Sequence, residues 1–178
     1  MRVLNLVETS GLQTDAGFFV IKRCGVSQYR KMGFDKEHYR HSPISPSAQC
    51  YLVAERDKSA VFVALLPNPC RGKRNVWRVS RFVILPEYQG KGLALAVLNF
   101  FGERVKGFDC QLTISTGDAL FAATLLKSTT WTMSVFKRET KNCPYPLFSF
   151  CYGAYQKPSY VKLVKKNKTI DEVLNGTR

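Results

Sequence analysis

The stretch Arg81–Leu98 constrains the fold of this chain more than any other part of the sequence. Its pattern predicts an apolar strand, a Gly-rich turn and the start of an apolar-faced helix. Gly90 and Gly92 allow the backbone of the turn to approach a ligand closely. The first amides of the helix and the positive end of its dipole then favour an anion, most often a phosphate. The simpler alternative is a strand–helix connection whose glycines only permit the turn.

The length of 178 residues and a hydrophobic content of 45% predict one folded domain, residues 1–178, with a basic tail from about residue 157 to 178. No apolar run is long enough for a transmembrane helix or a secretory signal. Six cysteines are scattered without a C-x-x-C pair, which favours reduced, buried thiols over a zinc site. We therefore expect a cytoplasmic protein with no membrane partner.

The charge balance, 27 Lys and Arg against 13 Asp and Glu, gives a formal net charge of +14. Such an excess on a small domain favours a polyanionic partner, and nucleic acid first. Basic residues gather in one loop and in the tail, where lysines alternate with apolar residues and a tyrosine. The candidate nucleic-acid contacts are Arg71, Lys73, Arg74, Lys162, Lys165 and Lys166. The alternative is a solvated surface that only keeps the protein soluble.

Strand and helix patterns alternate along the chain in an order that predicts an α+β protein, a sheet layered with helices. Strands are expected over 17–24, 49–56, 60–66, 76–85, 110–115, 131–138 and 147–156, with a possible strand or arm over 1–7. Helices are expected over about 28–37, capped by Ser27, over 91–105 and over 119–127. In the strand 76–85, alternation sets Trp77, Val79 and Arg81 against Arg78 and Ser80, and Arg81 is a candidate to direct its guanidinium into a cleft.

A proline-containing loop, residues 37–46, holds both histidines of the chain. His38 and His41 flank Tyr39, and these side chains are suited to proton transfer near neutral pH or through a phenol. The two histidines are also candidate metal ligands. The alternative is a surface loop without chemistry.

The segment Gln89-Gly-Lys-Gly-Leu-Ala94 fits Q/R-x-x-G-x-G/A and follows an apolar strand that ends in Leu-Pro-Glu-Tyr. This combination resembles the acyl-CoA pyrophosphate loop of the GNAT acetyltransferase superfamily. The resemblance implies a GNAT-like, mixed but mostly antiparallel sheet flanked by helices, and acetyl-CoA or another acyl donor as co-substrate. It implies that the amides from Gln89 to Ala94 hold the pyrophosphate. The positions carried over for the donor are Val83, Leu85, Gln89, Gly90, Lys91, Gly92, Leu93 and Ala94.

Further short pieces between residues 37 and 136 resemble a GNAT-like branch, the Mom-like DNA modification proteins of phages. They are Glu37-His-Tyr39, Ser80-Arg81, Ser115-x-x-Asp118 and Ser128-Thr-Thr-Trp131. This resemblance implies transfer of a carbamoylmethyl (acetamido) group to N6 of adenine in DNA, as antirestriction in a phage-infected or prophage-bearing cell. The base would be flipped out of the duplex or met single-stranded.

The same resemblance assigns the active site to His38, Tyr39, Arg81, Ser115 and Asp118. His38 would accept the proton, Tyr39 would donate a hydrogen bond or stack on the base, and Asp118 would orient the amine. Iron is implied, with His38 and His41 as its ligands. For Asp118, the alternative from the sequence alone is an N-cap of the helix 119–127.

Two further functions stay open at this point. The intact Gln89–Ala94 loop favours an ordinary acetyl-CoA-dependent N-acetyltransferase acting on a protein or small-molecule amine. A non-catalytic, basic GNAT-like module that binds nucleic acid is the third. The oligomeric state is also open, a dimer included.

Overall fold

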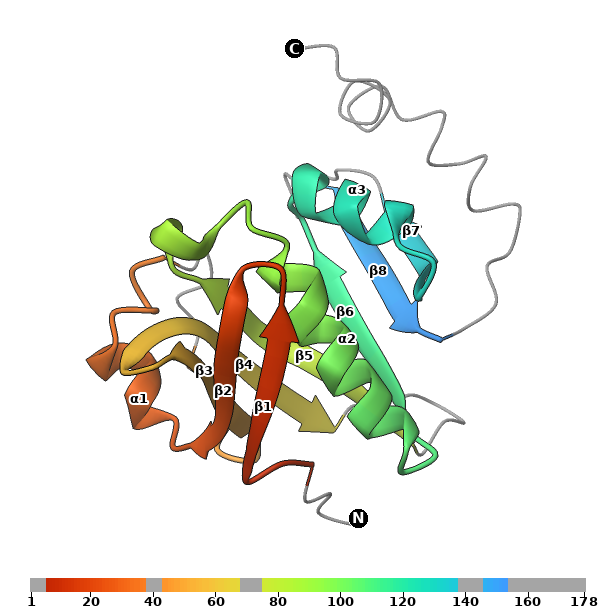
Figure 1. The fold of residues 1–178 in the computed structure, drawn as a ribbon. Helices are drawn as coiled ribbons and strands as arrows, with labels where there is room; N and C mark the ends of the chain where they lie inside the picture. The colour runs from red at the N-terminus through yellow and green to blue at the C-terminus, as the bar shows by residue number, and fades with distance from the viewer. Residues whose placement is uncertain (1–5, 38–42, 68–74, 138–145, 154–178) are drawn as a thin grey trace. The chain divides into compact units, whose positions relative to one another are not determined.

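The computed structural model describes residues 6–37, 43–67, 75–137 and 146–153 (Figure 1). The chain divides into two compact units, residues 1–112 and 113–178. They are called the N-terminal and C-terminal units below, and each is described by itself.

The N-terminal unit is built on an antiparallel sheet in which each strand pairs with the next along the chain. Its strands are β1 (Thr9–Thr14), β2 (Gly17–Cys24), β3 (Gln49–Glu55), β4 (Lys58–Pro67) and β5 (Val76–Ile84). β4 is buried along most of its length, with exposures of 0% from Ala60 to Leu65. A strand that is apolar on both faces requires cover on both sides.

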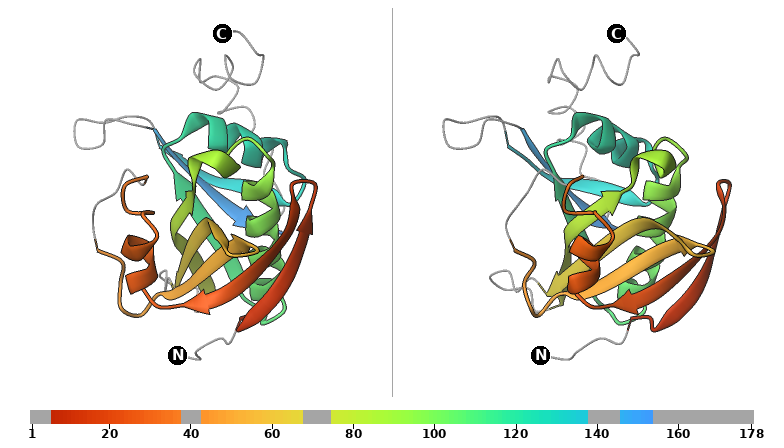
Figure 2. Two further views of the ribbon diagram at one scale, coloured as in Figure 1. Left: turned by 60° about the vertical axis from the view of Figure 1, so that its left-hand side comes forward. Right: turned by 90° about the vertical axis from the view of Figure 1, so that its left-hand side faces the viewer.

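Two helices provide this cover, on opposite faces of the sheet: α1 (Ser27–Lys31) and α2 (Leu93–Lys106) (Figure 2). Tyr29 of α1 packs on Phe62, with ring centroids 4.9 Å apart. Phe101 of α2 packs on Tyr51 at 4.8 Å. Phe62 pairs with the neighbour of Tyr51 in β3, so the two contacts lie on opposite faces.

The C-terminal unit carries α3 (Ala119–Lys127), β7 (Trp131–Lys137) and β8 (Leu147–Tyr152), and β6 (Gln111–Thr116) enters it from the N-terminal unit. β8 pairs antiparallel with both β6 and β7. The Trp131 ring meets Tyr152 edge-on at 5.2 Å. The unit thus has an apolar core, to which Phe148 and Phe150 also contribute.

These elements confirm the predicted fold class, an α+β protein with a mostly antiparallel sheet flanked by helices. β2 and α3 have the predicted bounds, Gly17–Cys24 and Ala119–Lys127. In the described part of the chain, none of the helices has the length and apolar character that a membrane crossing needs.

Three local features differ from the prediction: the strand β1, the N-cap of α1 and the C-terminal end of α1, expected at about residue 37. The strand β1 was not predicted, because Thr-Ser-Gly-Leu-Gln-Thr has no alternation of apolar and polar residues. The segment is a strand because it pairs with β2. Ser27 is not the N-cap of α1: Val26 is, without a side-chain cap. The helix ends at Lys31 because Gly33 turns the chain at a φ of +77°.

A β-bulge in β5 also changes the expected direction of Arg81. Ala64 pairs with Arg81 and Leu65 pairs with Val79, which leaves Ser80 as the extra residue. Since Ala64 and Leu65 face opposite sides of β4, Arg81 and Val79 do so too, against the simple alternation. Arg81 therefore shares the α1 face of the sheet with Cys50 and Ala64.

Candidate functional site

The Gly-rich turn between β5 and α2 has the backbone that its glycines predict. Gly90 and Gly92 both lie in the left-handed region, with φ values of +74° and +72°. A Cβ atom at either position would meet nothing within 4 Å. The glycines are therefore required by backbone conformation, and the space above the turn is open to a ligand.

The N-terminus of α2 faces this turn without a side-chain cap. Gly92 is the N-cap, and it makes no side-chain cap hydrogen bond to the first turn. The first turn also holds no acidic residue that would compete with a bound anion. Leu93 is 1% exposed and anchors the helix start in the core. The result is a set of amide donors with the positive end of a helix dipole behind them.

The strand end and the turn are fixed to each other by short hydrogen bonds. The Gln89 Nε2 donates to the Ile84 carbonyl oxygen at 3.0 Å, and the Tyr88 amide donates to the Leu85 carbonyl oxygen at 2.9 Å. Leu85 packs on the buried cluster that includes Val83. The Gln89 side chain thus closes the loop, and the Gln89 amide donates to the Pro86 carbonyl oxygen at 3.2 Å, so the amides offered to a ligand begin after Gln89.

Tyr88 has a structural role that the sequence did not reveal. Its ring is 6% exposed and meets Phe19 edge-on at 6.1 Å. Its hydroxyl donates to the Glu55 carboxylate at 3.4 Å. Burial first, and then the Glu55 charge, raise the pKa of the Tyr88 hydroxyl above its usual value. Phe19 and Glu55 lie far from Tyr88 in sequence, so no local pattern could have indicated these contacts.

Arg81 is buried in the N-terminal unit, with 6% of its surface exposed. Its Nη1 donates to the Ser80 carbonyl oxygen at 2.8 Å. Burial raises the pKa of the nearby Tyr29 hydroxyl, and the Arg81 charge opposes that rise. This guanidinium therefore lies beneath α1, and its role in catalysis stays a prediction.

Asp118 and Ser115 lie in the C-terminal unit, each with a partner. The Asp118 Oδ1 accepts a hydrogen bond from the Phe121 amide at 3.0 Å and caps α3. The Ser115 hydroxyl hydrogen-bonds to the Ser149 hydroxyl at 2.8 Å. Asp118 thus has the capping contact that the sequence offered as the alternative to catalysis. Both side chains are exposed, and their catalytic roles stay predictions.

The predicted donor residues Lys91 and Ala94 lie in and after the Gly-rich turn, exposed and half-buried respectively. The other predicted catalytic, metal and nucleic-acid residues lie outside the described residues. They are His38, Tyr39 and His41 in the first loop, Arg71, Lys73 and Arg74 in the second, and Lys162, Lys165 and Lys166 in the tail. Within the described ranges, no group of three or more His, Cys, Asp or Glu side chains could hold a metal. The iron and nucleic-acid assignments therefore stay predictions.

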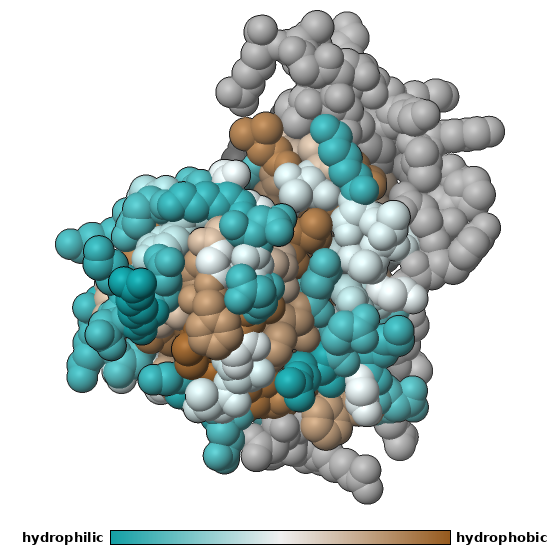
Figure 3. Space-filling view, in the orientation of Figure 1, coloured by the Kyte–Doolittle hydropathy of each residue, from teal (hydrophilic) through white to brown (hydrophobic). Residues whose placement is uncertain are grey.

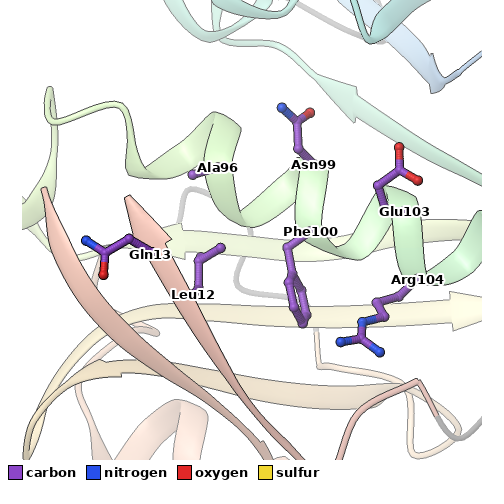
Figure 4. A pocket seen from close by; sticks show the side chains of 7 residues that line it. All are labelled: Leu12, Gln13, Ala96, Asn99, Phe100, Glu103 and Arg104. Carbon is purple, nitrogen blue, oxygen red and sulfur yellow. The ribbon is translucent and has the colours of Figure 1, made fainter. Parts of the chain in front are cut away.

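A groove of about 400 Å³ lies in the N-terminal unit between β1 and α2 (Figure 4). Leu12, Ala96 and Phe100 form its apolar part, and apolar side chains reach the surface in this region (Figure 3). The Arg104 guanidinium lies over the Phe100 ring, 5.2 Å from its centroid. None of the predicted site residues lines this groove.

Comparison with known proteins agrees with the turn geometry. The model of the acetyltransferase (GNAT) family matches residues 21–124, which include β5, the Gly-rich turn and α2. A search among curated proteins gives no match.

Solved structures share the fold at low sequence identity. An IAA acetyltransferase from Bacillus cereus matches with a TM-score of 0.59 and 16% identity, over 75% of this chain and 98% of that one. The ribosomal-protein-S18-alanine N-acetyltransferase from Escherichia coli matches with a TM-score of 0.58 and 13% identity, over 75% and 92%. A Bacillus subtilis acetyltransferase in complex with CoA matches with a TM-score of 0.52 and 11% identity, over 76% and 98%.

Proposed function

We propose that this chain, which belongs to the acetyltransferase (GNAT) family and is therefore a transferase, moves an acetyl group from acetyl-CoA to an amine nitrogen. The observation that carries this proposal is the pair of left-handed glycines before the uncapped start of α2, inside the matched region. Such a turn offers several amides to a pyrophosphate at once. This family membership favours a transferase over a non-catalytic binding module.

The reaction follows from the chemistry of a thioester and an amine. The neutral amine attacks the thioester carbonyl carbon, a C–N bond forms and the C–S bond breaks. A base takes the proton that the nitrogen loses, and CoA leaves as a thiolate that is protonated to the thiol. Holding the donor by its pyrophosphate fixes the reacting carbonyl and supplies the effective concentration that such a reaction needs.

Residues of the N-terminal unit would hold the donor. The amides from Gly90 to Ala94 would bind the pyrophosphate. The Gln89 amide, which the sequence also assigned to it, donates to the Pro86 carbonyl oxygen instead, and the Gln89 side chain holds the loop through Ile84. The bulge at Ser80 interrupts the regular pairing of β5 with β4, upstream of the Gly-rich turn. An acyl donor that extends from the turn along β5 would reach this irregular part of the strand. His38 is our candidate base, from the sequence alone.

A nucleic-acid amine is a second candidate acceptor, and the net charge of +14 favours it. The Mom-like reading makes this amine N6 of adenine in DNA and the transferred group a carbamoylmethyl group. A family that binds CoA thioesters does not by itself supply that group, so we rank this candidate below plain N-acetylation. Protein and small-molecule amines are the first class of acceptor to test.

One set of experiments separates these candidates. We expect calorimetry to show binding of CoA. We expect turnover of acetyl-CoA, measured as thiol release, to require an amine from a panel of peptides, polyamines and oligonucleotides. Mass spectrometry of nucleosides from expressing cells is run in parallel. A modified deoxyadenosine that disappears with His38→Ala, with no CoA binding, would reverse our ranking. Absence of both CoA binding and modified nucleosides would refute the transferase proposals.

A further inference from the structure

Cys24 and Cys50 lie directly opposite each other at one end of the pairing between β2 and β3. Directly opposite residues of an antiparallel pair have Cα atoms about 4.5–5.5 Å apart, and their side chains leave the same face of the sheet. A disulfide needs Cα atoms about 4.4–6.8 Å apart, so the backbone already meets this requirement. The Cβ atoms of such a pair, about 4.5–5.5 Å apart, would have to approach by about 1 Å.

The two side chains also meet in one apolar cluster on the α1 face of the sheet. Cys50 is 2% exposed and belongs to the buried cluster that α1 covers, and Cys24 packs against this cluster. Burial first, and then the Cys50 thiol, raise the pKa of Cys24 to about 12, and the second cause requires the two sulfur atoms to lie close together. Cys24 is half-buried, so one of the two thiols borders the solvent.

We infer that Cys24 and Cys50 are a modification site for small-molecule disulfides, represented here by glutathione disulfide, and that they are joined to each other by a disulfide bond as the chain folds. This bond would close the segment 25–49, which carries α1 and both histidines of the chain. The inference goes beyond acetyl transfer and does not depend on it.

The reaction consists of two thiol–disulfide exchanges. The Cys24 thiolate attacks one sulfur of glutathione disulfide, a mixed disulfide forms, and one glutathione thiolate leaves. The Cys50 thiolate then attacks the Cys24 sulfur, the protein disulfide forms, and the second glutathione thiolate leaves. The two protein thiols lose two electrons and two protons in total. Glutathione disulfide takes up the electrons, and the protons end on the two glutathione thiols.

The folded sheet separates the stability of this bond from the rate at which it forms. In the folded protein the pKa values of about 12 for Cys24 and about 11 for Cys50 leave little of the reactive thiolate. A chain that is still folding exposes both thiols to solvent, and the pairing of β2 with β3 then brings them together. Oxidation is therefore expected during folding, and the folded protein retains the redox state that it acquired there.

Refolding in the presence of glutathione disulfide tests the inference. Reduced wild-type protein is diluted from urea at pH 8 into an excess of glutathione disulfide. Iodoacetamide then blocks the free thiols, and peptide mass spectrometry without reductant identifies linked peptides. We expect the major protein disulfide to join Cys24 to Cys50 and to disappear with dithiothreitol. We expect its formation in protein that is already folded to be at least about tenfold slower.

The bond should also raise the midpoint of thermal unfolding. A disulfide that closes a loop of about 25 residues in a chain of this size should raise Tm by about 5–10 °C over the reduced protein. Cys24→Ser should abolish this rise, whereas the matched control Cys110→Ser should keep it. Both variants replace a half-buried thiol by a hydroxyl, but Cys110 lies outside the pairing of β2 with β3. Cys24→Ala, which adds no polar atom to the cluster, replaces the Ser variant if that protein does not fold.

Refolded wild-type protein with both thiols free in excess oxidant would overturn the inference. A major disulfide between any other two cysteines would overturn it as well. Oxidation of the folded protein as fast as that of the folding chain would overturn the inferred timing. CoA binding has no part in these measurements, so failure of this inference and failure of the acetyl-transfer proposal are distinguishable.

Discussion

Val79 and Arg81 are two residues apart in β5, yet their side chains emerge on opposite faces of the sheet. The bulge at Ser80 causes this, because it adds one residue to β5 that has no partner in β4. The Ser80 hydroxyl stabilises the bulge by donating to the Ala64 carbonyl oxygen at 3.1 Å. The bulge thus turns Arg81 toward Tyr29 on the α1 face.

We predict that Ser80→Ala lowers the free energy of unfolding by about 1 kcal/mol, the usual contribution of one such hydrogen bond. The substitution removes the hydroxyl and leaves the Ala64 carbonyl oxygen without that donor. Urea unfolding followed by circular dichroism measures the change. An unfolding free energy equal to that of wild type would show that the backbone alone maintains the bulge.

The left-handed glycine at the start of α2 predicts a cost for any side chain there. Gly92→Ala should lower the free energy of unfolding by about 1–2 kcal/mol, because an L-residue is strained at this φ. Distortion of the turn should also weaken CoA binding. Gly25→Ala is the matched control, since its Cβ would meet only the Ser27 hydroxyl at 3.6 Å and no left-handed φ is involved.

Equal effects of Gly92→Ala and Gly25→Ala on both stability and CoA binding would contradict this explanation. A loss of stability without a loss of CoA affinity would place the ligand away from the turn. Calorimetry and urea unfolding on the same preparations separate these outcomes.

The cap of α3 can be separated from any catalytic role of Asp118. Asp118→Ala removes the oxygen that accepts from the Phe121 amide, and we expect a loss of about 1 kcal/mol in unfolding free energy. Asp118→Asn keeps a cap of similar strength but removes the carboxylate charge. We therefore expect near-normal stability for the Asn variant.

The kcat of Asp118→Asn then decides the catalytic prediction. If the carboxylate orients the acceptor amine, kcat falls in this variant although the protein is as stable as wild type. An unchanged kcat would leave Asp118 with the capping role alone. Activity is measured as thiol release from acetyl-CoA with the acceptor that the panel identifies.

Two thiols on paired strands should be alkylated slowly and should make the stability of the fold depend on pH. Cys24 and Cys50 are directly opposite each other in β2 and β3. Burial raises the pKa of Cys24 to about 12, with a smaller contribution from Cys50, and burial raises the pKa of Cys50 to about 11. At pH 8 the reactive thiolate is thus scarcer in the folded protein than in the unfolded chain.

We expect iodoacetamide to modify Cys24 and Cys50 much more slowly in buffer than in urea, with peptide mass spectrometry to assign the sites. Because the folded pKa values exceed the unfolded value of about 9, the folded state favours the protonated thiols. Their contribution to stability is therefore complete below about pH 9 and is lost as the pH rises through 11 and 12. Rapid alkylation of both thiols in the native protein would contradict this.

The sequence by itself determined the strand–turn–helix element and most of the secondary structure. Alternation and caps are local properties, so β2 and α3 could be placed to the residue, and the spacing of Gly90 and Gly92 indicated the left-handed turn. The resemblance to the acetyltransferase family rested on this same local stretch, which lies within residues 21–124 of the family match. Asp118 as a helix cap was also visible as an alternative.

Only the tertiary structure decided which distant residues support the loop and which way Arg81 points. Phe19 and Glu55 reach Tyr88 because β2 and β3 are neighbours in the sheet, and sequence separation hides such contacts. The bulge in β5 depends on its register with β4, since an unpaired residue exists only relative to a partner strand. Pairing between strands is a non-local choice, so the contacts that hold the Tyr88 ring, like the burial of Arg81, had to come from the folded sheet.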